Sequence, residues 1–175
     1  MNYFTIFPTA IGPCGIAWRE ELVVATNLPE GTPQATAVRL AERAMATRAE
    51  PPRTIRGAVA SISALLEGAT IDLDSIDCDF SGIEPLAASI YAATRTIPVG
   101  QTCTYGEIAE RLGDKQLARQ VGGALGRNPL PIVVPCHRVL GANGGLTGFS
   151  AFGGVETKRR MLEIEGAVRQ QSLFD

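Results

Sequence analysis

The chain has 175 residues, of which 45% are hydrophobic and 19% are charged, and its net charge is −2. This composition is typical of a folded, soluble protein and argues against a disordered chain. No apolar stretch approaches the roughly 20 residues of a membrane-spanning helix, and the N-terminus lacks the basic start of a signal peptide. We therefore expect a cytoplasmic protein without membrane contact, folded as two small domains that share an interface.

The charge is divided unevenly along the chain. Residues 1–84 contain six arginines and eleven acidic residues, a net charge of −5, whereas residues 85–175 contain ten basic and seven acidic residues, a net charge of +3. The second half is therefore the better candidate for binding a polyanion. The asymmetry is small, so it supports other evidence and carries no conclusion by itself.

In the first half, strands are expected before helices. Residues 3–8 and 15–25 are rich in strand-forming residues, and the glycines and proline at 12–15 predict a hairpin loop between them. We expect the N-terminus to start a sheet.

Two segments that follow have helical spacing of apolar residues, at about 35–45 and 58–66. The acidic stretch 69–84 is interpreted as a strand and a linker. With the boundary placed near Ser81 and Gly82, the chain is predicted to be an α+β protein with domains at 1–81 and 82–175.

The second half begins with a predicted helix at 85–94. Thr104 and Glu107 then have the spacing of a capping box, which predicts a helix at 105–112, and a second helix follows at about 115–126. Two short helices joined by a tight turn are typical of helix-turn-helix DNA-binding proteins, but they also occur in proteins that never bind DNA.

The second helix of this pair favours the DNA-binding interpretation. Gly122, Gly123 and Ala124 leave little bulk on one face, while Arg119 and Arg127 supply positive charge. A helix of this kind can approach a phosphate backbone closely.

The chemistry is concentrated around Cys136. Three prolines exclude a helix over 129–135 and predict an extended, rigid segment that delivers Cys136 at a fixed position. A thiol with an ordinary pKa, about 8.5, needs an adjacent base or cation to become a nucleophile at neutral pH. His137 and Arg138 follow directly in the sequence.

Neighbours on an extended chain point to opposite sides, so a direct bond between Cys136 and His137 is not expected. A bridging water or a local turn would couple them, and Glu165 or Glu163 would orient the other nitrogen of His137. The alternative is an inert cysteine beside a surface histidine. Inert core thiols are also the expectation for Cys14, Cys78 and Cys103; with one histidine and no C-x-x-C pair, we expect neither metal nor cofactor.

The segment Pro135-Cys136-His137-Arg138-Val139 resembles the active-site motif of the O6-alkylguanine-DNA alkyltransferases (methylated-DNA-protein-cysteine methyltransferases). Four further segments are similar to that family in the same order and at compatible spacing, over about residues 82–167: 97–100 with 104–109, 118–124 with 128–129, 148–150 and 162–166.

The resemblance implies a ribonuclease-H-like N-terminal domain and a C-terminal winged helix-turn-helix domain. It implies single-turnover repair, in which an alkyl group moves from O6-alkylguanine, or from O4-alkylthymine, in double-stranded DNA to the protein. The expected partner is therefore damaged double-stranded DNA, bound by a monomer. Because O6 of a stacked guanine is out of reach of a cysteine, the base must flip out of the helix.

The same resemblance implies roles for individual residues. Cys136 would attack the alkyl carbon, His137 would act as a base through a water, and Glu165 would polarise His137. Tyr105 would help to expel the nucleotide and donate a proton to the guanine oxygen, and Asn128 would hold a hinge beside the cysteine.

For DNA, the resemblance implies that Arg119 fills the space left by the flipped base while the helix enters the minor groove. The expected DNA contacts are Tyr105, Ala118, Arg119, Gly122 and Gly123. The residues expected to line the substrate pocket are Pro131, Val139, Phe149 and Ser150.

Three departures from the family pattern concern details. Leu86 and Tyr91 stand where the family has aromatic residues, with a Trp at the second position, and Phe149 stands where a Tyr is common. The loop at 150–152 is slightly long, which leaves the preferred alkyl group open.

Two rival interpretations are a non-catalytic damage-binding relative and a cysteine hydrolase. Retention of Cys136 argues against the first, and the sequence gives no sign of the oxyanion hole that the second requires.

Overall fold

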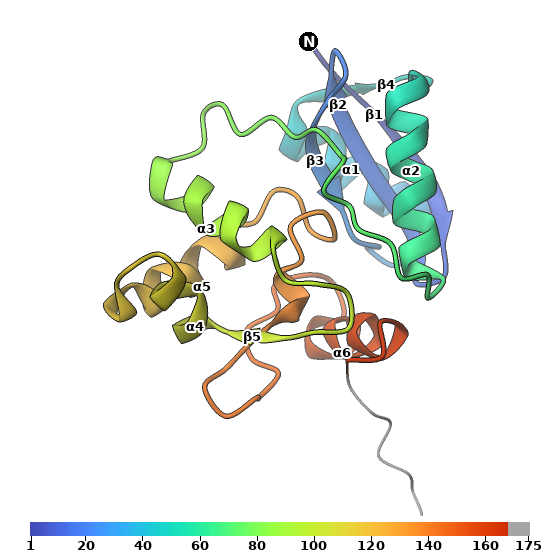
Figure 1. Ribbon diagram of the computed structural model, residues 1–175. Coiled ribbons are helices and arrows are strands. Elements are labelled where there is room, and N and C mark those ends of the chain that lie inside the picture. The colour runs from blue at the N-terminus through green and yellow to red at the C-terminus, as the bar shows by residue number, and fades with distance from the viewer. Residues whose placement is uncertain (168–175) are drawn as a thin grey trace, which may run out of the picture.

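The computed structural model describes residues 1–167, which form a mixed α+β structure as predicted (Figure 1). The strands are β1 (Asn2–Thr9), β2 (Gly12–Arg19), β3 (Leu22–Asn27), β4 (Ala46–Arg48), β5 (Cys103–Thr104) and β6 (Val139–Leu140). The helices are α1 (Pro33–Ala44), α2 (Arg53–Leu66), α3 (Pro85–Arg95), α4 (Tyr105–Arg111), α5 (Ala118–Gly126) and α6 (Gly154–Ile164), with 3-10 turns η1 (Lys115–Leu117) and η2 (Cys136–Arg138).

The N-terminal strands form a four-stranded sheet in the order β3-β2-β1-β4. Neighbours are antiparallel except β1 and β4, which are parallel. The predicted hairpin is present, but its turn lies at residues 10–11, because Thr9 pairs with Gly12. The loop expected at 12–15 was therefore wrong. A Cβ atom on Gly15 would lie 2.6 Å from Leu40 Cδ2, so this glycine makes room for α1 and does not form a turn.

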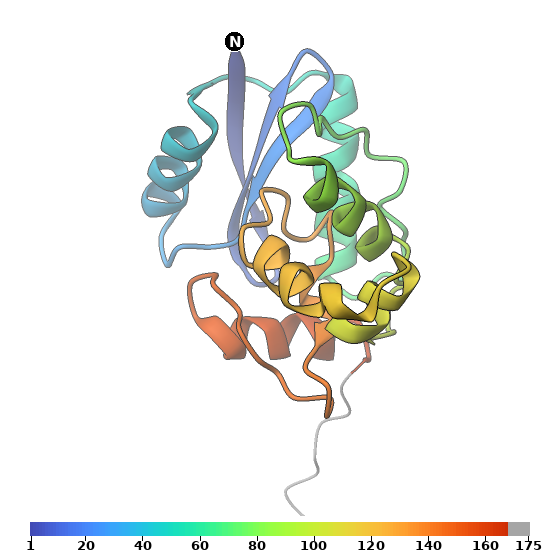
Figure 2. The ribbon, with the colours of Figure 1, turned by 90° about the vertical axis from the view of Figure 1, so that its left-hand side faces the viewer.

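The two faces of the sheet bury different residues because side chains alternate along a strand. Phe4 and Ala17 pack with Leu40 of α1 on one face. Ile16 of β2 and Ile62 of α2 belong to the larger core on the other face. Figure 2 shows the sheet between α1 and α2. The larger core continues into the second half of the chain, so both halves share one hydrophobic interior.

The first two helices differ from the prediction mainly at their starts. The side chain of Thr32 caps α1 by accepting a hydrogen bond from Ala35 N at 3.1 Å. Helix α2 begins at Arg53, directly after Pro52 and five residues before the predicted start. The prediction missed this first turn because it is mostly exposed and carries no apolar pattern. The strand expected within 69–84 is reduced to a single bridge between Val23 and Cys78.

In the second half, α3 and α4 match the prediction closely. The predicted capping box is confirmed: Glu107 N donates to Thr104 Oγ1 at 3.2 Å, and Thr104 N donates to Glu107 Oε2 at 2.7 Å. The helix predicted over 115–126 opens as the 3-10 turn η1 before α5 begins. The hydroxyl of Tyr91 donates to Ala124 O at 2.8 Å and ties α3 to α5. Within residues 1–167, no helix is both long and apolar enough to cross a bilayer.

Candidate active site

The segment before Cys136 is a tight turn, not the extended segment that we predicted. Val134 N donates to Leu130 O at 2.8 Å, and Ile132 has a φ of 77°, which a β-branched residue rarely adopts. The amide of Asn128 holds both ends of the turn, since its Nδ2 donates to Val134 O and its Oδ1 accepts from Leu130 N, each at 2.9 Å. The prolines exclude a helix as expected, but the hydrogen bonds of the Asn128 side chain hold the segment in a turn.

Cys136 begins the 3-10 turn η2 and is half-buried, whereas His137 is completely buried. Nε2 of His137 donates to Glu165 Oε1 at 2.8 Å, so Glu165, and not Glu163, is the carboxylate bonded to this ring. Nδ1 of His137 is buried and has no hydrogen-bond partner among the described residues. The ring therefore offers one unpaired nitrogen beside the cysteine turn.

Arg138 also binds Glu165, a contact that the sequence did not predict. Its Nε and Nη2 donate to the two oxygens of Glu165, each at 2.8 Å, and its Nη1 donates to Ile97 O at 2.7 Å. Burial tends to raise the pKa of Glu165, but the hydrogen bonds from His137 and Arg138 outweigh it and hold the pKa at about 2. Glu165 is thus a fixed carboxylate that orients the imidazole.

Both reactive groups are neutral at rest. Burial raises the pKa of Cys136, although the side chain of Asn128 and the charge of Lys158 act in the opposite direction. Burial also lowers the pKa of His137, against the opposing effect of Glu165. A neutral imidazole can accept a proton and a neutral thiol can release one, so the pair suits proton transfer during reaction better than a resting thiolate.

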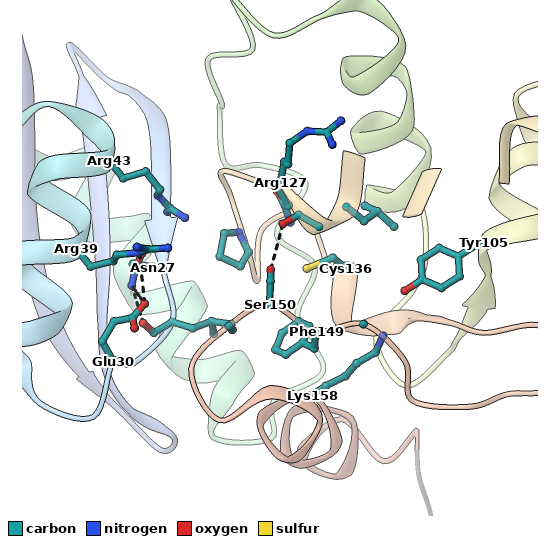
Figure 3. A pocket seen from close by; sticks show the side chains of 17 residues that line it. Asn27, Glu30, Arg39, Arg43, Tyr105, Arg127, Cys136, Phe149, Ser150 and Lys158 are labelled. Atoms are coloured by element: carbon teal, nitrogen blue, oxygen red, sulfur yellow. Dashed lines mark hydrogen bonds and ion pairs between the residues drawn. The ribbon is translucent and has the colours of Figure 1, made fainter. Parts of the chain in front are cut away.

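Cys136 faces a cavity of about 270 Å³ that both halves of the chain line (Figure 3). Of the residues predicted for the site, those in the lining are Tyr105, Asn128, Pro131, Cys136, Phe149 and Ser150. Val139 is fully buried outside the lining, and its carbonyl accepts a hydrogen bond from Lys158 Nζ at 2.6 Å. Ser150 Oγ donates to Gly126 O at 3.1 Å, which ties the loop after β6 to the end of α5.

Lys158 is a lining residue that the sequence analysis missed. It is 1% exposed, and its ammonium group lies 5.9 Å from the centre of the Phe149 ring. Its Nζ also donates to Thr147 O at 3.3 Å, so one buried cation holds the loop that carries Phe149. Sequence spacing gave no signal for this role, because Lys158 stands in a helix segment rich in exposed charges.

The predicted DNA-contacting residues lie on α4 and α5. Tyr105 is the first residue of α4, and burial raises the pKa of its hydroxyl. Arg119 is exposed and Ala118 is half-buried. A Cβ atom on Gly122 or Gly123 would meet ordinary contacts, 3.9 Å from the Tyr105 ring and 3.5 Å from the Arg127 guanidinium. Packing within the chain therefore does not require these two glycines.

No three His, Cys, Asp or Glu side chains of residues 1–167 gather where they could hold a metal ion. The fold and the site together define a mixed α+β protein in which a cysteine, backed by a buried histidine and carboxylate, faces a cavity beside a pair of short helices. This class of site is suited to group transfer onto the cysteine.

Comparison with known proteins identifies the family. The family model of the 6-O-methylguanine DNA methyltransferase DNA-binding domain matches residues 85–167. A methylated-DNA-protein-cysteine methyltransferase from Mycolicibacterium paratuberculosis is 46% identical over 116 residues, which is 66% of this chain and 68% of the relative. One from Methanosarcina acetivorans is 36% identical over 94% of this chain and 99% of the relative.

Among solved structures, Mycobacterium tuberculosis OGT in complex with DNA is similar, with a TM-score of 0.78 and 34% identity over 94% of this chain and 93% of that chain. The chain belongs to the methylated-DNA-protein-cysteine methyltransferase family. The resemblance found in the sequence is thereby confirmed.

Proposed function

We propose that this protein repairs DNA by direct reversal, moving the alkyl group of O6-alkylguanine in double-stranded DNA onto Cys136. The observation that carries the proposal is the half-buried Cys136 at the cavity, backed by buried His137 whose other nitrogen is held by Glu165. Membership of the methylated-DNA-protein-cysteine methyltransferase family supports it. The transferred group stays on the protein, so each monomer reacts once and needs no cofactor.

The proposed step is a nucleophilic displacement. The thiol proton of Cys136 passes through a water to Nδ1 of His137, the nitrogen that has no hydrogen-bond partner within residues 1–167. The sulfur then forms a bond to the alkyl carbon while the bond from that carbon to O6 breaks, and O6 keeps the electron pair. Tyr105 at the cavity wall donates a proton to that oxygen, and the resulting imidazolium and tyrosinate return to neutral by exchange with solvent.

Access to the base requires that the nucleotide leaves the stack. We infer that α5 enters the minor groove through Gly122, Gly123 and Ala118, since packing does not require the two glycines. Tyr105 expels the nucleotide, and exposed Arg119 fills the space it leaves. The flipped base is held against Pro131, Phe149 and Ser150 of the cavity and the backbone next to Val139.

The division of labour proposed between the halves follows the predicted boundary near residue 81. The part from 82 onward acts as a winged helix-turn-helix domain that binds DNA and carries the reaction, while residues 1–81 form a ribonuclease-H-like domain. The net positive charge of the second half supports this assignment.

Mass spectrometry of the intact protein and its peptides tests the proposal after incubation with a duplex that contains one O6-methylguanine. We expect one methyl group per chain, located on Cys136, and none on Cys136→Ser. A parallel duplex with O4-methylthymine tests the wider substrate range. A protein that binds the damaged duplex and stays unmodified would instead be a damage-binding relative without transferase activity.

A further inference from the structure

Arg127 carries a positive charge that the proposed reaction does not use. It caps the C-terminal end of α5 and directly precedes Asn128, which holds the cysteine turn. Arg127 lines the cavity of Cys136 and also a groove between α3 and α5. In Figure 3 its side chain extends beside Cys136, and the guanidinium points away from the sulfur. Arg127 therefore lies at the rim of the cavity and not at the reacting atom.

The other cations of the cavity already have partners within the protein. Arg43 and Lys158 donate hydrogen bonds to backbone carbonyls. Nε of Arg39 lies 4.0 Å from Oε1 of Glu30. The guanidinium of Arg127 is exposed, and within residues 1–167 it has neither a hydrogen bond nor an ion pair. It can therefore bind an anion without giving up a bond in the protein.

Arg119, Gly123 and Arg127 form one stripe along α5. They are four residues apart, so they share a face of the helix, and all three line the groove between α3 and α5. Gly123 leaves room for the second arginine, since a Cβ atom there would lie 3.5 Å from Nη1 of Arg127. The eight residues from Arg119 to Arg127 correspond to about 12 Å along a helix axis. One cation therefore lies at each end of the face that is proposed to enter the minor groove.

The proposed path of the DNA brings a phosphate close to the second arginine. If Arg119 fills the space in the base stack, Arg127 lies about 12 Å farther along α5 and thus outside the stack. It is then next to the opening of the cavity, which the exposed lining residues Gly126 and Ser150 mark. The backbone of the flipped nucleotide must cross this opening, because it stays joined to the duplex on both sides. Each phosphate carries a negative charge, and a guanidinium can bind two of its oxygens.

We propose that Arg127 binds a backbone phosphate next to the flipped nucleotide and so holds the damaged strand at the opening of the Cys136 cavity. The proposal rests on the proposed transfer to Cys136 and adds a DNA contact to it. Glu84, the carboxylate in the lining of the groove, does not compete for Arg127. Its two oxygens cap α3 by accepting from Leu86 N and Ala87 N, each at 3.1 Å.

Arg127→Gln should weaken DNA binding and make it less sensitive to salt. Exposed charge pairs contribute little, so we expect the affinity for a damaged duplex at low salt to fall about two- to fivefold. Loss of one phosphate contact should reduce the slope of log K against log salt by about 0.9. Arg127→Lys keeps the charge and should largely restore the slope. The rate of reaction with free O6-benzylguanine, which has no phosphate, should stay the same.

The test measures equilibrium binding in the Cys136→Ser background, which has no thiol to accept the alkyl group. The ligands are O6-methylguanine duplexes in which a neutral methylphosphonate replaces one phosphate, on the 5′ side of the lesion, on its 3′ side or at the far end of the duplex. Arg53→Gln is the control, because Arg53 is the exposed first residue of α2 and lines neither the cavity nor the groove. We expect one methylphosphonate beside the lesion to weaken binding about two- to fivefold, with no further loss when Arg127 is glutamine.

The contact is overturned if neither methylphosphonate beside the lesion weakens binding, or if the loss is as large with Arg127→Gln as without it. An unchanged salt slope in Arg127→Gln, or an equal change in Arg53→Gln, also refutes it, since the second result means that only net charge matters. Slower reaction of Arg127→Gln with O6-benzylguanine would place its role at the cysteine turn and refute the phosphate contact. The transferase function is judged separately: an unmodified Cys136 in the unaltered protein after incubation with O6-methylguanine duplex refutes that function, whereas the binding measurements decide on Arg127.

Discussion

At the scale of single residues, the notable arrangement is that Glu165 is shared between His137 and Arg138. The arginine is nearly buried and binds both carboxylate oxygens, so its charge compensates the carboxylate while the carboxylate orients the imidazole. The imidazole can therefore remain neutral, with Nε2 carrying the proton and Nδ1 ready to accept one. In this arrangement Arg138 is a positioning residue for the base.

Replacing His137 with phenylalanine tests the role of the ring as a base. The side chain keeps a similar shape and Glu165 keeps its two bonds to Arg138. Loss of a general base costs about 10²- to 10⁴-fold in rate, and we expect the single-turnover transfer rate at pH 7 to fall in that range. The deficit should shrink at pH 9, because hydroxide then ionises the thiol. A deficit that is constant with pH, or an equal loss of DNA affinity, would contradict the role.

Arg119→Ala tests the other proposed residue role, that of a side chain that replaces the flipped base. Arg119 is exposed on α5 and does not line the cavity of Cys136. We therefore expect slower repair of duplex DNA and an unchanged rate of reaction with free O6-benzylguanine. The two rates are measured side by side, with the exposed Arg53→Gln variant as control. An equal loss with both substrates would mean that Arg119 acts on the site itself.

At the scale of elements, strand β3 holds the turn that carries the cysteine. Thr26 is 1% exposed; its N donates to Pro129 O at 3.0 Å and its Oγ1 donates to Pro131 O at 2.5 Å. Asn128 fixes the same turn from the other side. The N-terminal sheet therefore reaches to within a few residues of Cys136, which gives the first half of the chain a part in positioning the site.

Thr26→Val removes the hydroxyl while keeping the shape of the side chain, and so leaves the buried Pro131 carbonyl without this partner. An unpaired buried polar group costs about 1–3 kcal/mol, and we expect the free energy of unfolding to fall by that amount. If the strand positions the site, the transfer rate should also fall while DNA affinity stays the same, and Thr26→Ser should restore both properties. A loss of stability with an unchanged rate would leave Thr26 a purely structural role.

The elements also show which parts of the structure the sequence could predict. The capping box of Thr104 and Glu107 was predictable because its partners are three residues apart, and the family motif identified Cys136 and His137. The hairpin turn was misplaced because Gly15 is needed for close packing against Leu40 of α1, and no local sequence pattern reveals such a tertiary contact. Likewise, Arg39 looks like an ordinary cation on an exposed helix face until the fold brings α1 to the cavity.

At the scale of the whole molecule, buried titrating groups limit stability at both ends of the pH range. In the native protein the pKa of Glu165 is about 2, and the pKa of His137 is also below its unfolded value. The stability that these two groups contribute is therefore lost as pH falls, and for His137 the loss begins below about pH 6.5. Burial raises the pKa of Cys14 and Cys78 to about 11, so their contribution is lost as pH rises above about 8.5.

We therefore expect the free energy of unfolding, measured with urea, to be greatest between about pH 6.5 and 8.5. The thiol of Cys14 alone should account for about 2 kcal/mol lost by pH 10, since one unit of pKa corresponds to about 1.4 kcal/mol. Cys14→Ala should be less stable at pH 7.5 but lose less between pH 7.5 and 10, and His137→Phe should lose less between pH 7.5 and 5. Parallel curves for the variants and the unaltered protein would contradict this account.

Reaction should also change the stability of the whole molecule, because the product keeps its alkyl group on a turn whose neighbouring residues are buried, at one wall of the cavity. Cys136 is half-buried, and the neighbouring Asn128 and Pro131 are buried within the turn that carries it. An added methyl group at such a site costs about 1–3 kcal/mol when the surroundings must shift. For a chain of this length, each 1 kcal/mol lowers the Tm by about 2–4 °C. We expect the Tm of the fully methylated protein to fall by several degrees, while Cys136→Ser treated with the same damaged duplex keeps its own Tm. An unchanged or higher Tm after reaction would mean that the cavity accepts the methyl group without displacing Asn128 and Pro131.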